Sequence, residues 1–589
     1  VVASRTANAV DTGEVAVLKR LAAGGQVGAA DLRPSIAFVR QRNDGADFRL
    51  ITLLRARYAF GDRFSPAAEA DLRATLLDVP YWMDRDGAGG PMVFWSENHQ
   101  ILFFTDEFLV GGLYPAATFR DGLSGAAHRA RARDRILFWL DQRWRFGFSE
   151  WNSHYYLEDL AALANLVDFA ADREVSVKAA MAMDLIFLDL AGQSTHGEFV
   201  AASGRLYENN AKFGDAAIRR VMRHAFVARQ DPASAAGIEI NVLMSGYQPP
   251  AVLRAIASDP GVAVVRASTG RRLEELDSDP ALAGDERRIM ALWGMEAITN
   301  PQAIDASARY IRSHGLLSNP HLAGFRALNY RMLTATGALP VVSRALDLPT
   351  NGVVLDRADT YAYRTADYVM STTQAYRPGG FGNQHRVFVL TFDPGVTLFH
   401  GQPATLPGEP PPNGNSPGYW TGSGRLPLSC QDGPVNLSLY RLPRSAGLGR
   451  RPLLAFTHLY APLGRFDRVL LQPRRLFLRH RGALVAVTAA VPLTQAGDAE
   501  FIQRGRDTFW VTEASSTREE SFDAFVARIS RTEARLDGGD HAARLLVRAA
   551  EAHEHLVQHH LVEHLEPGRL QPAREAARVA AGAREHLGE

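Results

Sequence analysis

The sequence predicts an α+β protein in which a large helical region comes first and a region of antiparallel β-strands follows. Three observations support this prediction. The chain has 589 residues, which is enough for about two to four domains. Its composition, 46% apolar and 22% charged, is typical of a folded globular protein. The spacing of apolar residues changes once, near residue 345, from the period of a helix to that of a strand.

Before residue 345 the chain is a succession of amphipathic segments. Leu157, Leu160 and Ala164 recur at intervals of three and four residues and so define one helical face. Asp215 stands where an N-cap is expected, just before another such segment. Long helices that alternate with loops predict a bundle, a solenoid or an (α/α) toroid. The predicted helices are 67–77, 101–109, 128–144, 156–170, 177–190 and 216–226.

After about residue 351, short alternating segments are separated by Gly and Pro turns, which is typical of an antiparallel sheet or sandwich. A stretch rich in Pro, Gly and Asn at 402–424 predicts a long exposed loop. From residue 522 onwards Ala, Arg, Glu and His dominate again, which predicts polar helices or a partly ordered appendix. The predicted strands are 386–392, 435–440, 453–458, 469–471, 476–480 and 483–488.

The charge and cysteine counts exclude several classes of protein. The 65 Lys and Arg residues are balanced by 64 Asp and Glu residues, so a strongly cationic nucleic-acid-binding protein is not expected. Cys430 is the only cysteine, so the chain forms no internal disulfide and has no CxxC metal or redox motif. No apolar run reaches about 18 residues, so we expect no membrane span. The P-loop and HExxH motifs are absent as well.

Four segments combine aromatic and polar residues at high density: 94–100, 148–156, 203–212 and 379–385. Ser96 is a good N-cap, which places Asn98 and His99 in the first turn of a helix. The competing interpretation is that the residues of such a segment only cap the helix and pack against it. The first two segments both precede helices. In a toroid of helical hairpins, helices that start on the same rim can line a common cleft, and their positive ends attract anions. The third segment also reads as an ordinary surface loop, and His385 in the fourth as a strand-edge histidine.

The residue types that recur in these segments, Asn, His, Tyr and Arg, suit β-elimination from a uronic acid. In that reaction a proton leaves the carbon next to a carboxylate, so donors or cations must neutralise the carboxylate charge. Tyrosine can serve as base and as acid when nearby cations lower its pKa. A glycosidase with paired carboxylates is the alternative. Its candidate residues are Glu97, Asp106, Glu150 and Asp159, whose spacing singles out no pair.

These motifs resemble those of the heparinase II/III-type and alginate-lyase-type polysaccharide lyases. The similarity lies in the pair Asn98-His99 at a helix start, in Tyr155, 57 residues after Asn98, and in the segment 382–385 before a strand. It covers roughly residues 50–515, mostly by the order of elements. The resemblance implies an (α/α) toroid catalytic domain over 1–340 and an antiparallel β-sheet (sandwich) domain over 345–520. The composition of 521–589 predicts a helical or partly ordered appendix after them.

The resemblance also implies roles for individual residues. Asn98 and His99 would neutralise the uronate carboxylate, Tyr155 would be the base and also the acid, and His385 would assist from the β domain. The implied substrate-binding residues are Trp95, Asn152, His154, Arg205, Tyr207 and Gln384. Two features depart from the family pattern. Glu97 stands where an Asn is familiar, so it either turns away or orients a neighbour, and His154 and Tyr156 flank Tyr155, so the base can shift by one position.

The sequence leaves two other readings open: a glycoside hydrolase on an (α/α) toroid, and a non-catalytic glycan-binding protein that stacks sugars on Trp95, Trp151 or Trp420. The expected partner is an anionic polysaccharide or oligosaccharide. No cofactor is required by the proposed chemistry, and a structural divalent cation in the β domain has no assignable ligands. The expected location is secreted or periplasmic, and a start at Val1 is compatible with a removed signal peptide.

Overall fold

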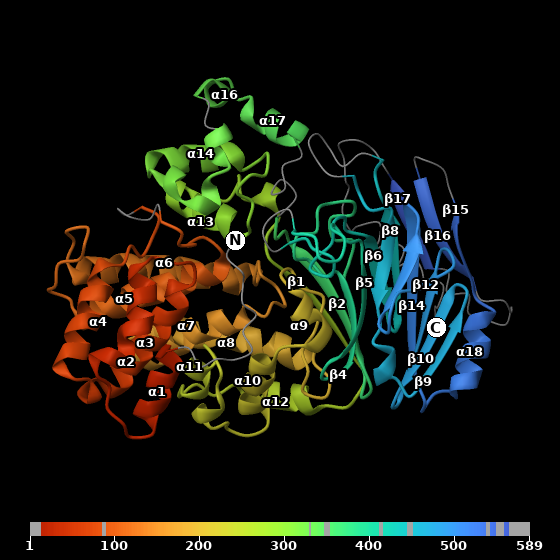
Figure 1. Ribbon diagram of the computed structural model, residues 1–589, viewed down its shortest axis with the longest axis horizontal. Helices are drawn as coiled ribbons and strands as arrows, with labels where there is room; N and C mark the ends of the chain where they lie inside the picture. The colour runs from red at the N-terminus through yellow and green to blue at the C-terminus, as the bar shows by residue number, and fades with distance from the viewer. Residues whose placement is uncertain are drawn as a thin grey trace. The chain divides into compact units, whose positions relative to one another are not determined.

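A computed structural model describes residues 13–84, 90–328, 331–346, 354–411, 416–444, 452–537, 542–548 and 559–564. The chain divides into two compact units that are both discontinuous in sequence. We call them the helical unit (Val1–Gly192, Asp215–Asp259 and Ser268–Arg357) and the sheet unit (Gln193–Gly214, Pro260–Ala267 and Ala358–Glu589). The α+β class predicted from the sequence is confirmed, with helices first and antiparallel sheets after them (Figure 1).

The helical unit is built from helices joined by short loops. Its longer helices are α1 (Gly13–Ala22), α2 (Ala29–Arg40), α3 (Ala46–Phe60), α4 (Pro66–Asp78), α5 (Glu97–Leu113), α6 (Gly125–Phe146), α7 (Tyr156–Phe169), α8 (Arg173–Gly192), α10 (Ala216–Phe226), α12 (Ala251–Ser258), α13 (Asp285–Gly294), α14 (Ile304–Ser313) and α17 (Leu339–Leu346). Short helices complete it: α11 (Ile240–Leu243), α15 (Phe325–Leu328) and α16 (Arg331–Ala335). All six helices predicted from apolar spacing are confirmed, and Asp215 caps α10 by accepting the Ala217 N–H at 2.8 Å.

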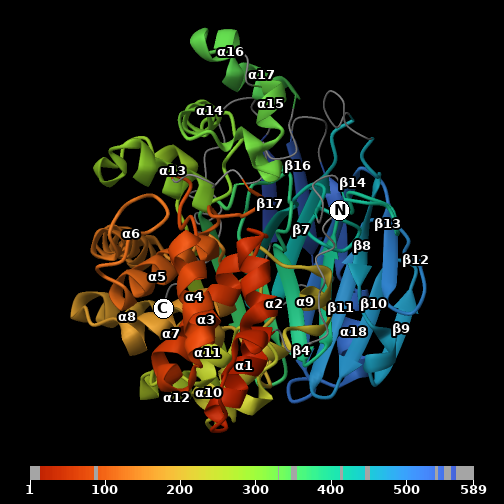
Figure 2. The same cartoon turned by 60° about the vertical axis from the view of Figure 1, so that its left-hand side comes forward.

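Helix α5 positions the candidate site. It packs against α3, α6 and α7, and these helices lie side by side in Figures 1 and 2. Every residue from Glu97 to Gly111 is buried, so α5 has no face in contact with water. Because buried polar groups need partners, the polar side chains at its start must find them in the neighbouring elements.

The sheet unit contains two large sheets. The first has the order β1 (Ala263–Thr269), β2 (Ala358–Arg364), β3 (Val369–Thr373), β4 (Phe388–Asp393), β5 (Val396–Gly401), β8 (Phe456–Tyr460), β13 (Glu500–Arg504) and β12 (Thr494–Gln495). The second has the order β6 (Leu428–Asp432), β7 (Val435–Arg441), β14 (Asp507–Ser516), β11 (Ala483–Ala489), β10 (Arg475–His480) and β9 (Arg468–Gln472). Pairs from β2 to β12 and throughout the second sheet are antiparallel.

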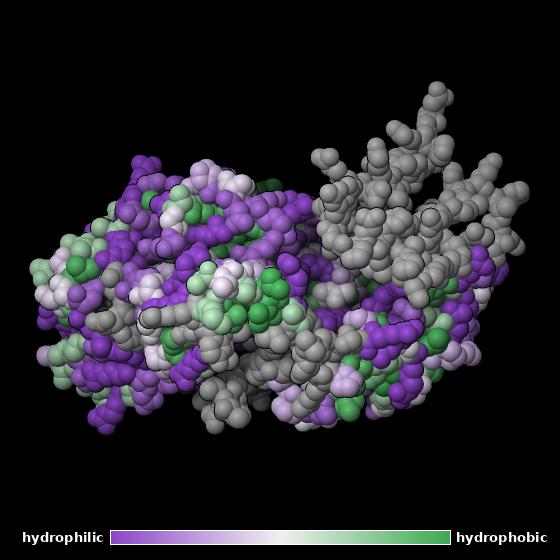
Figure 3. All heavy atoms as spheres, turned by 90° about the horizontal axis from the view of Figure 1, so that it is seen from above, coloured by the Kyte–Doolittle hydropathy of each residue, from purple (hydrophilic) through white to green (hydrophobic). Residues whose placement is uncertain are grey.

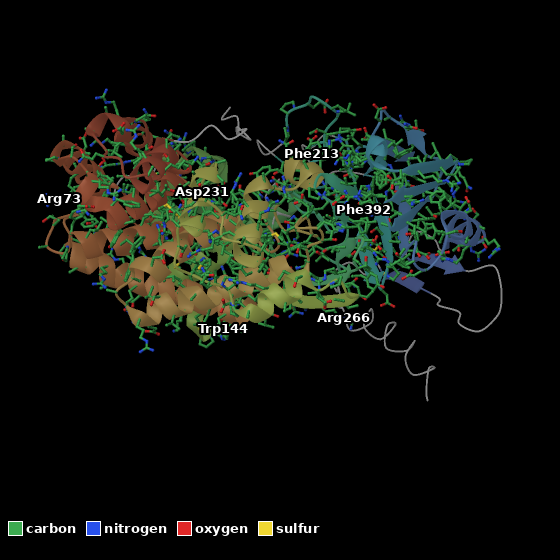
Figure 4. The ribbon with its side chains drawn as sticks, turned by 90° about the horizontal axis from the view of Figure 1, so that it is seen from below. Arg73, Trp144, Phe213, Asp231, Arg266 and Phe392 are labelled. Carbon is green, nitrogen blue, oxygen red and sulfur yellow. The ribbon has the colours of Figure 1, made fainter. Side chains whose placement is uncertain are left out.

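One buried apolar cluster joins the two sheets. It includes Phe388 and Leu398 from the first sheet and Leu476 and Trp510 from the second. Phe392, labelled in Figure 4, belongs to the same cluster. Strands with apolar residues on one face bury them by packing sheet on sheet, which accounts for the core of this unit.

Three local features differ from the sequence prediction. Strand β1 lies within the stretch expected to be helical, because it pairs with β2, which comes about 90 residues later. The segment 402–424 is irregular as predicted, but among its described residues only 406–410 are exposed, whereas Gln402, Ser416 and Trp420 are buried. The stretch 521–589 begins with helix α18 (Phe522–Ser530), but the strands β15 (Glu533–Asp537), β16 (Ala542–Arg548) and β17 (His559–His564) follow it. Its last part, 565–589, lies outside the described residues.

On the face drawn in Figure 3, hydrophilic residues cover most of the coloured surface and hydrophobic residues form small separate patches. Such a distribution is ordinary for a protein surface. None of the described helices combines the length and the apolar character needed to cross a membrane.

Candidate functional site

The residues singled out from the sequence fall into both units. Trp95, Asn98, His99, Asn152, His154 and Tyr155 belong to the helical unit. Arg205, Tyr207, Gln384 and His385 belong to the sheet unit. Within the helical unit, hydrogen bonds join the start of α5 to the loop 147–155 that precedes α7. Within the sheet unit, hydrogen bonds join the segment around Arg205 to the segment around Gln384.

Asn98 is fully buried and is bound on its donor side. Its Nδ2 donates to Oε2 of Glu150 at 2.6 Å and to Oγ of Ser96 at 3.0 Å. Its backbone N–H donates to the same Glu150 oxygen at 3.1 Å. Its Oδ1 has no hydrogen-bond partner among the described residues. In this arrangement the amide hydrogens of Asn98 are already used within the protein, and its carbonyl oxygen is the atom left over.

Glu97 turns towards the loop 147–155. Its carboxylate is paired with Arg143 of α6 and accepts the backbone N–H of Ser149 at 2.7 Å. Burial raises the pKa of Glu97, and Arg143 opposes that rise. Of the two options that the sequence left open for Glu97, the structure therefore favours a role in holding the neighbouring loop.

His99 is paired with an aspartate of α3. Its Nδ1 lies 2.6 Å from Oδ2 of Asp47, whose side chain is completely buried. Its Nε2 lies 3.8 Å from Oδ1 of the partly exposed Asp44. The ring stacks on Phe48, with centroids 5.1 Å apart and planes 10° apart. Burial by itself lowers the pKa of His99, but nearby carboxylates, above all that of Asp47, outweigh it and raise the pKa.

The loop 147–155 carries three of the predicted site residues and is anchored at both ends. Gly147 has a φ of 74°, and a Cβ there would lie 2.4 Å from Oγ1 of Thr269, so a larger residue does not fit. At the other end Asn152 has a φ of 50°, and its N–H donates to the hydroxyl oxygen of Tyr156 at 3.0 Å. Gly147 and the hydrogen bond from Asn152 to Tyr156 therefore hold the loop in a defined conformation.

Tyr155 and Tyr156 point to different environments, as the sequence predicts. Tyr155 is the N-cap residue of α7 and is half-buried, and its ring packs on that of His154 with centroids 4.1 Å apart. Tyr156 is buried, and its hydroxyl donates to Oδ2 of Asp189 at 2.8 Å. Burial, reinforced by Asp189, raises the pKa of Tyr156 well above its usual range. Tyr156 is thus suited to packing rather than to proton transfer.

Two further carboxyl groups of α7 lie beside this loop: Glu158, which sequence reasoning did not single out, and Asp159, one of the carboxylates considered for a glycosidase. Glu158 is half-buried in the first turn, its Oε2 has no hydrogen-bond partner among the described residues, and burial raises its pKa to about 8. Asp159 is fully buried, and burial followed by the nearby Glu97 raises its pKa well above the usual range. Burial therefore favours the protonated form of both groups.

None of the three tryptophans proposed as sugar platforms offers an open ring face. Trp151 is completely buried, and Trp95 is 7% exposed and meets Trp293 edge to face at 5.6 Å. In the sheet unit Trp420 stacks on His458 at 3.8 Å and lies 4.7 Å from the Nζ of Lys212. By contrast, Trp144 of α6, labelled in Figure 4, is 58% exposed.

The predicted residues of the sheet unit form a polar group of their own. Arg205 Nε donates to Oε1 of Gln384 at 2.8 Å, and the N–H of Leu206 donates to the Gln384 carbonyl at 3.0 Å. His385 is buried, with Nε2 3.1 Å from the hydroxyl of Tyr376. Arg205 and Gln384, predicted from separate segments, are therefore brought together.

Tyr207 lies next to the same group. It is half-buried and is the N-cap residue of the short helix α9 (Glu208–Phe213) of the sheet unit.

No group of three His, Cys, Asp or Glu side chains in the described part of the chain is arranged to hold a metal ion. No family model matches the chain, and no curated protein matches it either. The function must therefore be argued from the chemistry of these side chains.

Sequence reasoning missed Asp47 and Arg143, which hold His99 and Glu97. Asp47 lies in the first turn of α3 and Arg143 in the last turn of α6. Acidic residues in a first turn and basic residues in a last turn are common features of helices, so neither residue stood out. Only the packing of α3 and α6 against α5 gives them their partners.

Proposed function

We propose that the protein is a polysaccharide lyase that cleaves a uronic-acid-containing glycan by β-elimination. The observation that carries the proposal is the pairing of His99 with the buried Asp47, which favours a protonated imidazole in the first turn of α5. A cation at a helix N-terminus is suited to a substrate carboxylate, because the helix dipole adds to its attraction for anions. In this proposal the helical hairpins form an (α/α) toroid and the protein is secreted or periplasmic.

In the proposed reaction His99 neutralises the uronate carboxylate and so stabilises the carbanion that forms next to it. Tyr155 removes the proton from that carbon and then protonates the leaving oxygen. The bond between carbon and the leaving oxygen breaks, and a carbon–carbon double bond forms beside the carboxylate. The other predicted residues keep the roles that the resemblance implies, His385 as an assisting histidine and Arg205, Tyr207 and Gln384 as sugar-binding residues. No cofactor takes part in these steps.

Asn98 has a more specific part in this proposal than the sequence suggested. Its amide hydrogens are bound to Glu150 and Ser96, so it reaches a substrate carboxylate only if that group takes the place of the Glu150 carboxylate. The two carboxylates are chemically equivalent acceptors, which makes such an exchange reasonable. Otherwise Asn98 acts by fixing Glu150 and the loop that carries Tyr155.

A glycoside hydrolase is the second candidate, and one observation favours it. Glu158 has a pKa of about 8 and a buried oxygen without a partner among the described residues, which are properties of a general acid. Glu150, which interacts electrostatically with Glu158, accepts two N–H bonds from Asn98. A general acid with a raised pKa beside a second carboxyl group is the arrangement that glycoside hydrolases use.

One experiment separates the two candidates. The full chain is incubated with alginate, glucuronan, hyaluronan and heparan-type polymers, and both ultraviolet absorbance and new reducing ends are followed. A lyase gives both signals, because the new double bond absorbs, whereas a hydrolase gives only reducing ends. Reducing ends without absorbance would contradict the lyase proposal, and the absence of fragments from every polymer would contradict both.

A matched pair of variants links the activity to the site. Tyr155→Phe removes only a hydroxyl and should abolish elimination. Tyr247→Phe removes the hydroxyl that donates to Asp184 elsewhere in the helical unit and should keep the wild-type rate. Equal loss of activity in both variants would show that the effect is not specific to Tyr155.

A further inference from the structure

We propose that Asp47 positions His99 for its reaction, by accepting a hydrogen bond at Nδ1 and leaving Nε2 as the nitrogen that meets the substrate. The role of His99 in the reaction rests on the proposed function, whereas the pairing itself does not. Asp47 is a positioning residue here, because it acts through His99 and does not touch the substrate. Nothing in the sequence pattern singled it out.

The contact between the two residues is short and protected from water. Nδ1 of His99 lies 2.6 Å from Oδ2 of Asp47, and the Asp47 side chain has no exposed surface. The other carboxylate oxygen, Oδ1, has no hydrogen-bond partner among the described residues. A buried carboxylate is costly unless it is paired. Burial raises the pKa of Asp47, and His99 is the group that opposes this rise.

The orientation of the imidazole ring is set by packing as well as by this hydrogen bond. Phe48, the residue after Asp47, stacks on the ring at 5.1 Å, and Phe103, one turn further along α5, lies nearly parallel to it at 6.5 Å. A flip of this stacked ring would place the carbon Cδ2 where Nδ1 lies and so lose the hydrogen bond to Asp47. The Asp47 carboxylate therefore keeps the proton of the neutral ring on Nδ1, as an aspartate does for a catalytic histidine in general.

The second nitrogen faces a different environment. Nε2 lies 3.8 Å from Oδ1 of Asp44, which is beyond hydrogen-bond distance, and the Asp44 side chain is 47% exposed. The two nitrogens of His99 therefore differ: one is committed to a buried acceptor and the other lies beside a partly exposed group. Nε2 is the nitrogen available to a substrate carboxylate.

Carboxyl groups face His99 from each of the elements around it. Asp44 and Asp47 come from the start of α3, and Glu150 from the loop 147–155. Glu158 of α7 is near enough to interact with His99 electrostatically. Asp44, Asp47 and Glu150 favour the protonated imidazole, but only Asp47 adds a direct hydrogen bond. Loss of Asp47 should consequently lower the pKa of His99 without abolishing the influence of the others.

The first test uses the wild-type chain labelled with 15N in histidine, with the His99 signals assigned from a His99→Gln variant. The proposal requires that Nδ1 keep its proton across the titration, because Asp47 accepts it throughout. It also requires a pKa above the ordinary value for histidine. A neutral His99 that carries its proton on Nε2, or a His99 that titrates as an exposed histidine does, would overturn the proposal.

The second test compares Asp47→Asn with Asp44→Asn. Asp47→Asn should lower the pKa of His99 by about one unit or more and alter its tautomer, since an amide can donate to Nδ1 where the carboxylate can only accept. Asp44→Asn is the matched control and should change the titration little, because its carboxylate is partly exposed and forms no hydrogen bond to the ring. Equal titrations of the two variants would overturn the proposal.

Turnover on a cleaved uronate polymer gives the functional readout. Asp47→Asn should lower kcat by roughly 10-fold to 10⁴-fold with little change in KM, the range seen when a histidine loses its orienting carboxylate. Asp47→Glu, which keeps the charge, should recover part of the loss. If the wild-type chain cleaves no uronate polymer while the 15N titration behaves as stated, the proposed function fails and the pairing remains. Wild-type turnover in a folded Asp47→Asn variant would overturn the positioning role.

Discussion

Both N–H groups of Asn98 meet one carboxylate oxygen of Glu150, the side-chain Nδ2 at 2.6 Å and the backbone nitrogen at 3.1 Å. Glu97 forms the reciprocal link, since its carboxylate accepts N–H groups from Ser149 and Glu150. The first turn of α5 and the loop 147–155 are thereby tied together by two buried carboxylates. This link holds the turn that carries His99 against the loop that leads to Tyr155.

Removal of the Glu150 carboxylate should weaken this link. In Glu150→Ala the buried Nδ2 of Asn98 keeps only Ser96 as an acceptor, and its backbone N–H loses its acceptor. We expect the free energy of unfolding to fall by about 1–3 kcal/mol, the usual cost of leaving buried donors unpaired. Urea unfolding measures it. Glu174→Ala, at an exposed position on α8, is the control and should stay within about 0.5 kcal/mol of the wild type.

The free energy of unfolding should depend strongly on both members of the pair Glu97 and Arg143. Arg143→Met leaves Glu97 buried without its cation, which should cost about 3–5 kcal/mol. The double variant Glu97→Gln/Arg143→Met removes the uncompensated charge and should be more stable than Arg143→Met alone. A double-mutant cycle by chemical denaturation measures the coupling. Simple additivity of the two single changes would contradict a direct interaction between these side chains.

Tyr155 and Tyr156 should respond oppositely to the loss of a hydroxyl. Tyr156→Phe removes the bridge between the N–H of Asn152 and the carboxylate of Asp189, so we expect stability to fall by about 1–3 kcal/mol. Tyr155→Phe should leave the melting temperature nearly unchanged and abolish elimination. Thermal unfolding and turnover, measured on the same two preparations, test both statements. A stable but inactive Tyr156→Phe beside an active Tyr155→Phe would move the base by one position.

Glu158 should make stability depend on pH. Burial raises its pKa to about 8 from an ordinary value of 4.5, so between these values the folded chain keeps a proton that the unfolded chain has lost. Stability attributable to this group therefore falls as the pH rises through that window, and below it the effect disappears.

Glu158→Gln removes this titration while keeping the shape of the side chain. Its melting temperature should increase relative to that of the wild type as the pH is raised from about 5 to about 8. Glu174→Gln, an exposed change, should show no such trend. If the difference between wild type and Glu158→Gln is constant over this range, the pKa of Glu158 is not raised in the folded protein.

Much of the fold is readable from local spacing. The predicted helix 101–109 lies inside α5, the predicted helix 216–226 coincides with α10, and the predicted strand 435–440 lies inside β7. In α10 the apolar period agrees with the helix that forms, because one face of it is buried. Helix α5 and strand β7 are buried almost throughout. Strand β1 was missed because its neighbour β2 is distant in sequence and helices surround it on both sides.

The segment 402–424 shows why burial is harder to predict than backbone type. Its Pro and Gly content correctly indicates irregular backbone. Arg386 of the sheet unit, however, donates to the carbonyl oxygens of His400 and Trp420, and His458 stacks on the Trp420 ring. Burial lowers the pKa of Arg386 to about 10. Its hydrogen bonds to these two carbonyl groups hold the segment against the rest of the sheet unit. The composition of the segment does not indicate these contacts.

The sequence by itself determined the order and type of the elements, and it placed Asn98 and His99 in the first turn of one helix and Tyr155 at the start of another. These are local properties, set by residues three or four positions apart. The partners were decided only by tertiary packing: Glu150 for Asn98 and Asp47 for His99, each 52 residues away. No periodicity encodes such a distance, because a buried polar group takes whichever partner the packed helices bring to it.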